Sequence, residues 1–464
     1  MPDGGRVRHH EVLAYDTGRL ESVLGADRVR AFNERLEWAA GALKGRRLVN
    51  VTGDDQRKGG VYEIMRGTIP YLRGAGIDVL WVDLTTSPKA RPSLEFFHLL
   101  AHGRSVAADW RAEFPVRTAE FVEFGRAAAP ELVQLLRPSD FLVLHDTQTA
   151  PVLPELRPWR DSLLWHAHIG TGDQNELVDG YWEIVGPNVA AAGGRVFYRP
   201  EYAPPALRDS SIFASPGVDP SAPKSIPLDR DEARRALSSP PAAWPLTWLT
   251  GQDRLFDEPH QVVAAQLSRW DPLKDMSGAF RVFAEVAARV PSFVGLVVGP
   301  SAQSASERAE LELCLEEWKK AAPDISSRVH IGVIENCGTA EHDDAVRTVQ
   351  SAADVILQKS VQEGFGLTVT EAMLRGKPVV AAAVGGIPLQ LHDRHNGVLV
   401  DPGSDETSWA DHLHELVSNN DLRSRLGTRA LGDVLEHHTV DRHLNAVIDA
   451  VAEMPPCDAP PGGR

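Results

Sequence analysis

Six short apolar segments in the second half of the chain constrain its fold most strongly. They read HQVVAAQLSRW, FVGLVVGP, RVHIGVI, ADVILQKS, KPVVAAAVGG and NGVLVDP, and stretches with helical spacing separate most of them. Short runs rich in valine and isoleucine that alternate with helices are typical of a parallel sheet covered on both faces. The second half is therefore predicted to form a doubly wound parallel sheet.

The first half of the chain begins the same pattern with a βαβ unit. An apolar strand runs to Val51, a glycine turn follows, a helix carries an apolar stripe over residues 61–72, and a strand returns over residues 79–82. Further strands are predicted in DFLVLHD and SLLWHAHIG, which end in polar or glycine residues where a parallel sheet presents its carboxyl edge. The predicted fold class is α/β, with two Rossmann-like, doubly wound parallel-sheet domains facing a cleft.

Proline and serine become frequent and the periodicity lapses over residues 216–259, which places the domain junction there. A chain of 464 residues is also too long for one ordinary core. We expect an N-terminal domain over residues 1–235, a C-terminal domain over 236–440, and a C-terminal helix and disordered tail over 441–464.

Composition narrows the expected partners and compartment. The formal charge of −16 repels nucleic acid and anionic membranes, and no apolar run is long enough to cross a bilayer. Cys314, Cys337 and Cys457 lack the paired spacing of a zinc site or a disulfide framework. We expect a cytoplasmic protein that binds neither nucleic acid nor membrane, and a homodimer is left open.

The stretch VQEGFGLTVTEAMLRGKPVV places a loop and a helix N-terminus after a predicted strand. The free amides around Gly366, Leu367 and Thr368, with the positive end of the helix dipole, suit a phosphate group. Glu363 and Glu371 can accept hydrogen bonds from sugar hydroxyls, so a nucleotide diphosphate sugar would satisfy both features. The structural alternative is an ordinary loop charge and a solvated helix glutamate.

A second stretch, SRWDPLKD, places Arg269 and Lys274 just beyond the strand QVVAAQL. If that strand is parallel to its neighbours, both cations lie at the same sheet edge and can neutralise a diphosphate. By itself, Arg269 fits a charged surface turn better.

Together, EGFGLTVTEA, QLSRWDPLKD and VVGP closely resemble family 4 of the retaining glycosyltransferases, which have the GT-B fold. The resemblance runs from about Val49 to about Asp441. QKSVQEGFGLTVTEAM and VGGIPLQL carry a narrower resemblance to trehalose synthases and retaining trehalose phosphorylases. Leu389 stands where the wider family usually has a glutamate.

This resemblance implies a donor site in the second domain. Glu371 would bind the ribose hydroxyls, Glu363 the hydroxyls of the donor sugar, and Arg269 and Lys274 the diphosphate. The backbone amides that would cradle the sugar and phosphate belong to Gly364, Phe365, Gly366 and Leu367.

In the first domain, the glycine loop KGGVYE, with Gly59 and Gly60, resembles the loop that approaches the donor phosphate and the acceptor. His168 in WHAHIG resembles the histidine beside the donor sugar. His145 and Asp146 occupy a comparable strand end and are weaker candidates.

The resemblance implies a retaining hexosyltransferase that moves glucose from a nucleotide diphosphate sugar, such as ADP-, GDP- or UDP-glucose, to a sugar acceptor bound by the first domain. No cofactor beyond that substrate and no essential metal are expected. Alternatives are a trehalose phosphorylase-like enzyme using glucose 1-phosphate, a transferase acting on an aminocyclitol or other polyol, a nucleotide-sugar epimerase, and a degenerate sugar-binding protein. Lys58 and Gly170 depart from the trehalose synthase pattern where an acceptor would lie.

Overall fold

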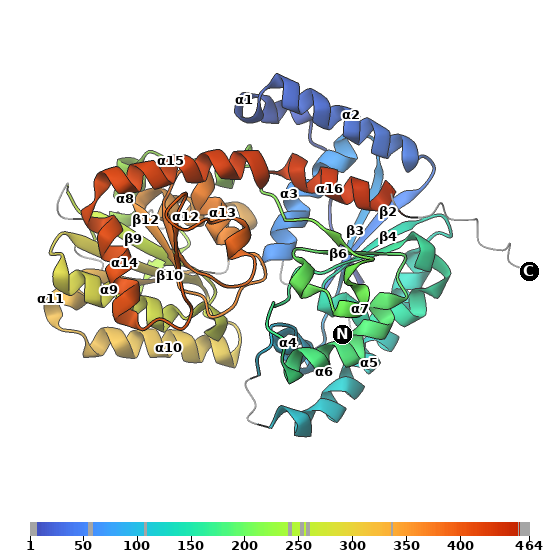
Figure 1. Cartoon of the computed structure of the whole chain (residues 1–464), viewed down its shortest axis with the longest axis horizontal. Helices are drawn as coiled ribbons and strands as arrows, with labels where there is room; N and C mark the ends of the chain where they lie inside the picture. The colour runs from blue at the N-terminus through green and yellow to red at the C-terminus, as the bar shows by residue number, and fades with distance from the viewer. Residues whose placement is uncertain are drawn as a thin grey trace, which may run out of the picture. The chain divides into compact units, whose positions relative to one another are not determined.

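The computed structural model of the chain describes residues 7–53, 59–105, 109–239, 244–250, 255–256, 260–335, 337–452 and 454 (Figure 1). It divides into two compact units, of which unit 1 spans Met1–Asp219 and Thr439–Arg464 and unit 2 spans Pro220–His438. The chain therefore passes from one unit to the other twice.

Unit 1 contains a seven-stranded sheet in the order β1-β3-β2-β4-β5-β6-β7, in which only the edge strand β1 is antiparallel to its neighbour. Its central strands β2 and β4 are almost entirely buried, because helices cover both faces. The strands are β1 Val7–His9, β2 Arg47–Thr52, β3 Asp78–Leu84, β4 Phe141–His145, β5 Leu163–His166, β6 Gly194–Phe197 and β7 Ile212–Phe213.

Two groups of helices cover this sheet. In Figure 1, α2, α3 and α16 lie on one side of strands β2 to β6, and α4, α5 and α6 lie on the other. The helices of unit 1 are η1 Thr17–Leu20, α1 Glu21–Leu24, α2 Ala26–Ala42, α3 Gly60–Gly74, α4 Arg91–Ala101, α5 Trp110–Leu135, η2 Thr147–Ser162, α6 Glu176–Ala190, η3 Pro200–Tyr202, α7 Pro205–Arg208 and α16 Val440–Ala452.

Unit 2 repeats this architecture with a seven-stranded sheet in the order β14-β13-β12-β9-β10-β11-β8, and only the edge strand β8 is antiparallel. The apolar runs predicted from the sequence supply its parallel strands. The strands are β8 Leu246–Trp248, β9 Val262–Leu267, β10 Phe293–Pro300, β11 Val329–Ile334, β12 Val355–Gln358, β13 Val379–Ala382 and β14 Val398–Val400.

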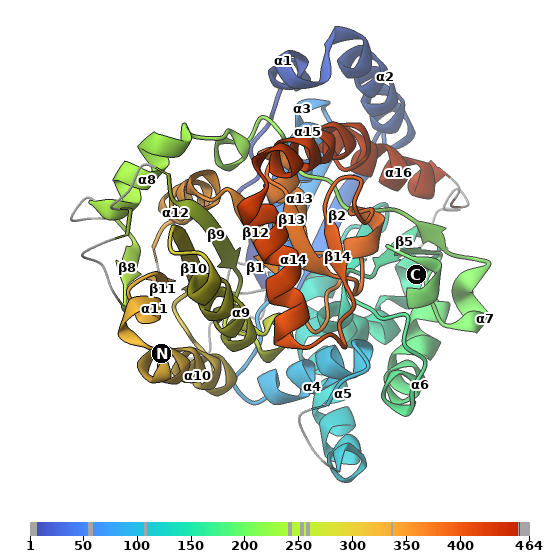
Figure 2. The same cartoon turned by 60° about the vertical axis from the view of Figure 1, so that its left-hand side comes forward.

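The helices of unit 2 also form separate groups. Helix α9 packs against α10 and α14, whereas α12 packs against α8, and α13 against α15 (Figure 2). They are η4 Pro223–Ser225, α8 Arg230–Ser238, η6 Pro272–Lys274, α9 Met276–Arg289, α10 Ala305–Lys320, α11 Pro323–Ser326, α12 Thr339–Ala352, α13 Leu367–Leu374, η7 Ile387–Leu389, α14 Glu406–Ser418 and α15 Asn420–His437.

The predicted α/β class with two doubly wound parallel sheets is confirmed. The unit limits differ from the expected domain limits, since the first crossing lies at Asp219–Pro220 and residue 235 falls inside α8. Helix α16 packs on α2 and α3 and is part of unit 1, so the residues from 441 onward do not form a separate part. Residues 455–464, expected to form a disordered tail, lie outside the described residues.

The strand order fixes where each unit can bind a ligand. In unit 2, the chain adds β10 and β11 on one side of β9 and then returns to add β12 and β13 on the other side. In unit 1, β3 and β4 lie on opposite sides of β2 in the same way. The crevice at the carboxyl ends of such strand pairs is the usual ligand site of open α/β sheets. Among the described residues, no helix combines the length and apolar composition needed to cross a bilayer.

Helix α15 offers a matched test of the packing that positions α13. A Cβ on the buried Gly427 would lie 2.1 Å from the carbonyl oxygen of Gly376, at the end of α13, whereas a Cβ on the exposed Gly432 would meet nothing within 4 Å. We expect Gly427→Ala to lower the free energy of unfolding by about 1–3 kcal/mol because the two helices must separate. Gly432→Ala should raise it by about 0.5–1 kcal/mol because alanine favours the helix.

Chemical denaturation of both variants, followed by circular dichroism, measures this difference. Equal effects of the two substitutions would contradict the close contact between α13 and α15.

Candidate active site

The loops that follow β9 and β12 lie side by side at the carboxyl edge of the unit 2 sheet. Buried Gln266, at the end of β9, holds both of them: its Nε2 donates to the Lys274 carbonyl at 2.8 Å and its Oε1 accepts from the Lys359 amide at 2.9 Å. The Val361 amide also donates to the Leu273 carbonyl at 2.8 Å. The stretches SRWDPLKD and VQEGFG are therefore parts of one site.

A buried ion pair joins these two loops. Lys274 Nζ lies 2.7 Å from Glu363 Oε1, and the two side chains are 16% and 8% exposed. The same oxygen accepts from Ser360 Oγ at 2.8 Å and from Gln358 Nε2 at 3.1 Å. Three donors on one oxygen offset much of the cost of burying the carboxylate, and they fix its position.

The glycine loop before α13 has a backbone that other side chains would not permit. Gly366 caps the helix with φ +89° and ψ 57°, a left-handed conformation that favours glycine. Gly386 packs against the loop so closely that a Cβ there would lie 2.7 Å from Phe365 Cα. Buried Gln390 donates to the Phe365 carbonyl at 2.6 Å and accepts from Thr370 Oγ1 at 2.6 Å. These contacts fix the position of the α13 N-terminus, where the first amides of a helix suit an anion.

Glu371 lies within α13 and forms an ion pair that its sequence neighbourhood does not suggest. Its Oε1 lies 2.6 Å from Lys224 Nζ, and the side chains are 13% and 14% exposed. Arg375, one turn later, donates to the Glu371 carbonyl at 2.7 Å and to the Lys224 carbonyl. The segment at Lys224 is thereby attached to α13.

Arg269 is the most exposed of the predicted donor-site residues with a charge. Its guanidinium lies 3.1 Å from Asp271, and its side chain is 48% exposed. Asp271 also accepts from the Leu273 amide at 2.9 Å, which fixes the turn before Lys274. Arg269 is on the predicted edge but has more freedom than Lys274.

In unit 1, Gly59 and Gly60 begin α3 at the carboxyl edge of the sheet. Gly59 is the helix N-cap with φ +99°, and Gly60 is the first helical residue. Lys58, the predicted departure from three glycines, lies outside the described residues.

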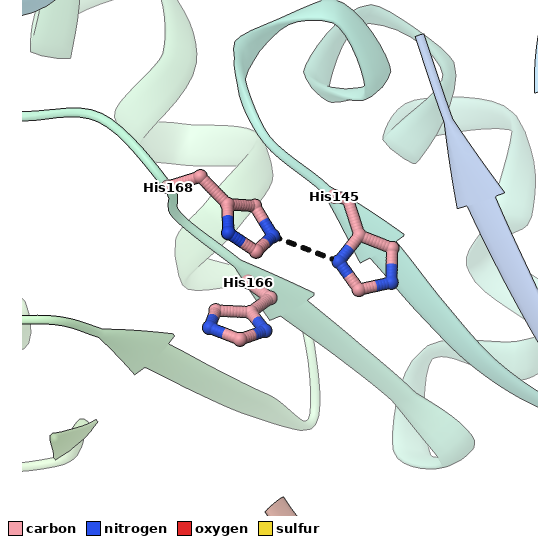
Figure 3. Close-up of side chains that lie close together, drawn as sticks. All are labelled: His145, His166 and His168. Atoms are coloured by element: carbon pink, nitrogen blue, oxygen red, sulfur yellow. Dashed lines mark hydrogen bonds between the residues drawn. The ribbon is translucent and has the colours of Figure 1, made fainter. Parts of the chain in front are cut away.

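His168 lies on the same sheet, just after β5, in a buried cluster with His145 and His166 (Figure 3). Its Nε2 lies 2.9 Å from His145 Nδ1, its Nδ1 bonds the hydroxyl of Tyr198, and its amide donates to Asp146 Oδ1 at 3.3 Å. His145, at the end of β4, continues the chain of hydrogen bonds to Asn50 Oδ1 at 3.1 Å. Both weaker candidates, His145 and Asp146, are therefore partners of His168.

Burial governs the protonation of these groups. It lowers the pKa of His145 to about 3 and, with repulsion from neighbouring histidines, holds the pKa values of His166 and His168 well below 6.5. Burial also raises the pKa of Asp146 to about 7, although backbone amides oppose the shift. The three imidazoles are thus neutral at neutral pH.

Gly170 follows this cluster, and its lack of a side chain has a structural reason. A Cβ at Gly170 would lie 2.6 Å from Cγ and 2.8 Å from Cβ of the buried Tyr202. The tyrosine ring thus occupies the space that an aspartate would need. The sequence departure at this position is coupled to a residue on η3.

The structure groups the predicted residues by unit. Arg269, Lys274, Glu363 and Glu371 lie on one edge of unit 2 with the glycine loop, while His168 and the Gly59 loop lie on the carboxyl edge of unit 1. Sequence reasoning missed several supporting side chains because most are polar residues distant in sequence from their partners. They are Asn50, Tyr198, Tyr202, Lys224, Gln266, Gln358, Ser360 and Gln390. Only the amides at strand ends, such as Gln266 and Gln358, carried a local signal.

Comparison with known proteins assigns each half of the chain. The family model "Trehalose synthase, N-terminal domain" matches residues 49–204, and the model "Glycosyl transferases group 1" matches residues 254–432. These matches fall on the sheets of unit 1 and unit 2, respectively.

Full-length relatives support the same assignment. A trehalose synthase of Rubrobacter xylanophilus is 31% identical over 430 residues, which cover 90% of this chain and 93% of that protein. A trehalose synthase of Pyrococcus horikoshii is 28% identical over 459 residues, which cover 96% and 99%.

Among solved structures, an α,α-trehalose-phosphate synthase (UDP-forming) from Burkholderia vietnamiensis superposes with a TM-score of 0.63 at 14% identity, covering 88% of this chain and 96% of that one. This similarity supports the GT-B fold. The chain therefore belongs to the trehalose synthase family of glycosyltransferases, in which a trehalose synthase N-terminal domain is joined to a group 1 glycosyltransferase domain.

Proposed function

We propose that this glycosyltransferase moves glucose, with retention of the anomeric configuration, from a nucleotide diphosphate sugar to a sugar acceptor. The observation that carries the proposal is the buried pair of Lys274 and Glu363 beside the N-terminus of α13. At one sheet edge, the pair offers a cation and a carboxylate that can accept hydrogen bonds from sugar hydroxyls. A diphosphate attached to a sugar requires both.

The charges of the site favour a donor with a diphosphate. Lys274, Arg269 and the free amides at the start of α13 can share the negative charge of the diphosphate. Glu363 would accept hydrogen bonds from the sugar hydroxyls, and Glu371, eight residues further on, from the ribose. The structurally similar enzyme of Burkholderia vietnamiensis is described as UDP-forming, which agrees with a nucleotide donor.

In the proposed reaction, the acceptor hydroxyl attacks the anomeric carbon on the face that the phosphate leaves. The bond from that carbon to the phosphate oxygen breaks, the bond to the acceptor oxygen forms, and the acceptor proton passes to the leaving phosphate. The enzyme must stabilise charge on the leaving group and hold the acceptor in place. Lys274, Arg269 and α13 would provide the charge stabilisation, so we expect transfer to continue in the presence of a chelator.

We assign acceptor binding to unit 1, with the Gly59–Gly60 loop and His168 as candidate contacts. Trehalose is the expected product, because the relatives are trehalose synthases over nearly the whole chain. Tyr202 in the space beside Gly170 changes the shape and polarity of this region, which leaves room for another sugar or a polyol as acceptor.

A donor panel tests the reaction class. Purified protein is incubated with glucose and either ADP-, GDP-, UDP- or dTDP-glucose or glucose 1-phosphate, and products are identified by mass and anomeric proton signals. We expect α-linked disaccharide from at least one nucleotide sugar and none from glucose 1-phosphate. Turnover only with glucose 1-phosphate would instead establish a phosphorylase, and an inverted anomeric signal would refute retention.

Substitution of the ion pair tests the site. Lys274→Met should lower kcat by about 10²–10³-fold because it removes one donor to the leaving group. It should also destabilise the protein, because Glu363 is left buried without its cation. Glu363→Gln should likewise reduce transfer. In the double variant, the two neutral side chains should restore much of the stability and none of the activity.

Thermal unfolding and initial rates are measured for the three variants, with Lys377→Ala as the control. Lys377 is a half-buried lysine before β13, at the opposite end of the sheet, and its Nζ donates to the Ser351 carbonyl at 2.9 Å. We expect this variant to retain transfer. Recovery of activity together with stability in the double variant would show that the pair is only structural.

A further inference from the structure

Three histidines of unit 1 converge on one point from adjacent strands. His145 ends β4, His166 ends β5, and His168 follows two residues later. One ring nitrogen from each lies within 4.8 Å of those of the other two, and all three side chains are buried. In Figure 3, the ring of His168 is hydrogen-bonded to that of His145, and the ring of His166 lies next to that of His168. Lone pairs of imidazole nitrogens at such spacing are typical ligands for transition-metal ions.

Asn50 sets the tautomer of one of these rings. With its side-chain Oδ1 facing His145 Nε2 at 3.1 Å, it accepts the hydrogen of that nitrogen, which leaves the lone pair on His145 Nδ1. That lone pair points at His168 Nε2, 2.9 Å away. Hydrogen bonds of this kind orient histidine ligands in metal sites.

His168 can present the matching tautomer. Its Nδ1 bonds the Tyr198 hydroxyl, which can either donate or accept. If the ring hydrogen moves from Nε2 to Nδ1, Tyr198 accepts it and the lone pair of Nε2 faces His145. The ring needs no net loss of a proton to become a ligand.

His166 is the third member of the set, and one of its two ring nitrogens is unpaired among the described residues: its buried Nε2 has no hydrogen-bond partner there. A buried polar nitrogen without a partner costs free energy, which a turn of the ring that brings Nε2 to a bound metal ion would recover. The centroid of its ring lies 4.2 Å from that of His168. The ring of His443 also stacks on the ring of His166, with centroids 5.8 Å apart.

We propose that His145, His166 and His168 form a binding site for one divalent transition-metal ion of the zinc or cobalt type. Such ions bind histidine nitrogens at about 2.0–2.1 Å, and tetrahedral ligands then lie roughly 3.3 Å apart. His145 Nδ1 and His168 Nε2 are 2.9 Å apart, and ligand nitrogens of all three histidines lie within 4.8 Å of one another, so rotation of the rings would be needed to reach this geometry. Neutral imidazole is the form that binds metal, and burial keeps these histidines neutral. The site goes beyond the proposed function and is not offered as part of the transfer step.

The test uses the untagged full-length chain after removal of metals with a chelator. Calorimetry with Zn²⁺ and the visible absorption of Co²⁺ measure affinity, stoichiometry and geometry. We expect one ion per chain and the intense absorption of tetrahedral Co²⁺. His166→Asn should weaken binding at least about 10²-fold, and Asn50→Leu about 10-fold through the lost orientation of His145.

His443→Gln is the matched control. His443 is buried in the same neighbourhood and stacks on His166, but its Nδ1 bonds the Ser215 carbonyl at 3.0 Å. This variant should keep the wild-type affinity within about threefold. Equal loss in His166→Asn and His443→Gln would overturn the proposal, as would wild-type protein that binds no ion with one-to-one stoichiometry.

Anomalous scattering from crystals soaked in Zn²⁺ locates the ion without any substitution. A peak among the three rings supports the proposal even if a variant fails to fold. A peak only elsewhere, for example at His98 and His102, whose ring centroids are 4.9 Å apart, would refute it.

Discussion

The parallel pairing of β9 with β12 is the constraint on which the candidate donor site depends. It brings together two loops that lie far apart in the sequence, and the buried side-chain amides of Gln266 and Gln358 then hold them to each other. Only with the loops fastened can Lys274 and Glu363 meet at 2.7 Å with little exposure to water. The ion pair is therefore a consequence of the strand order. Attraction between two charges exposed to water would be too weak to bring these side chains together.

Close backbone contacts give the same edge its shape. Gly386 lies against the Phe365 backbone and Gly427 against that of Gly376, so both ends of α13 are held by neighbours that have no side chain. Larger residues would push the helix away from the sheet and shift its amides. Positions such as these control a binding site although they carry no functional group of their own.

The sequence predicted the alternation of strands and helices, and with it the edge that holds Arg269, Lys274, Glu363 and Glu371, because buried parallel strands are continuous apolar runs. It did not predict β1 or β8, which are short and antiparallel. Nor could it pair Lys224 with Glu371, since 147 residues separate them and only the tertiary fold brings them together. His166 was part of the quoted WHAHIG stretch, yet its convergence with His145 depends on the register of β4 and β5.

Helix α16 gives the two units different histories during synthesis on the ribosome. Unit 2 is one continuous segment, so all of its sheet is available once residue 438 has emerged. All seven strands of unit 1 precede unit 2 in the chain, but α16 follows it and must still pack on α2. There, Arg28 Nε lies 2.7 Å from Asp441 Oδ2, a residue 413 positions later in the sequence. The unit that is made first is thus completed last, and its apolar surface under α16 stays uncovered until that helix has emerged.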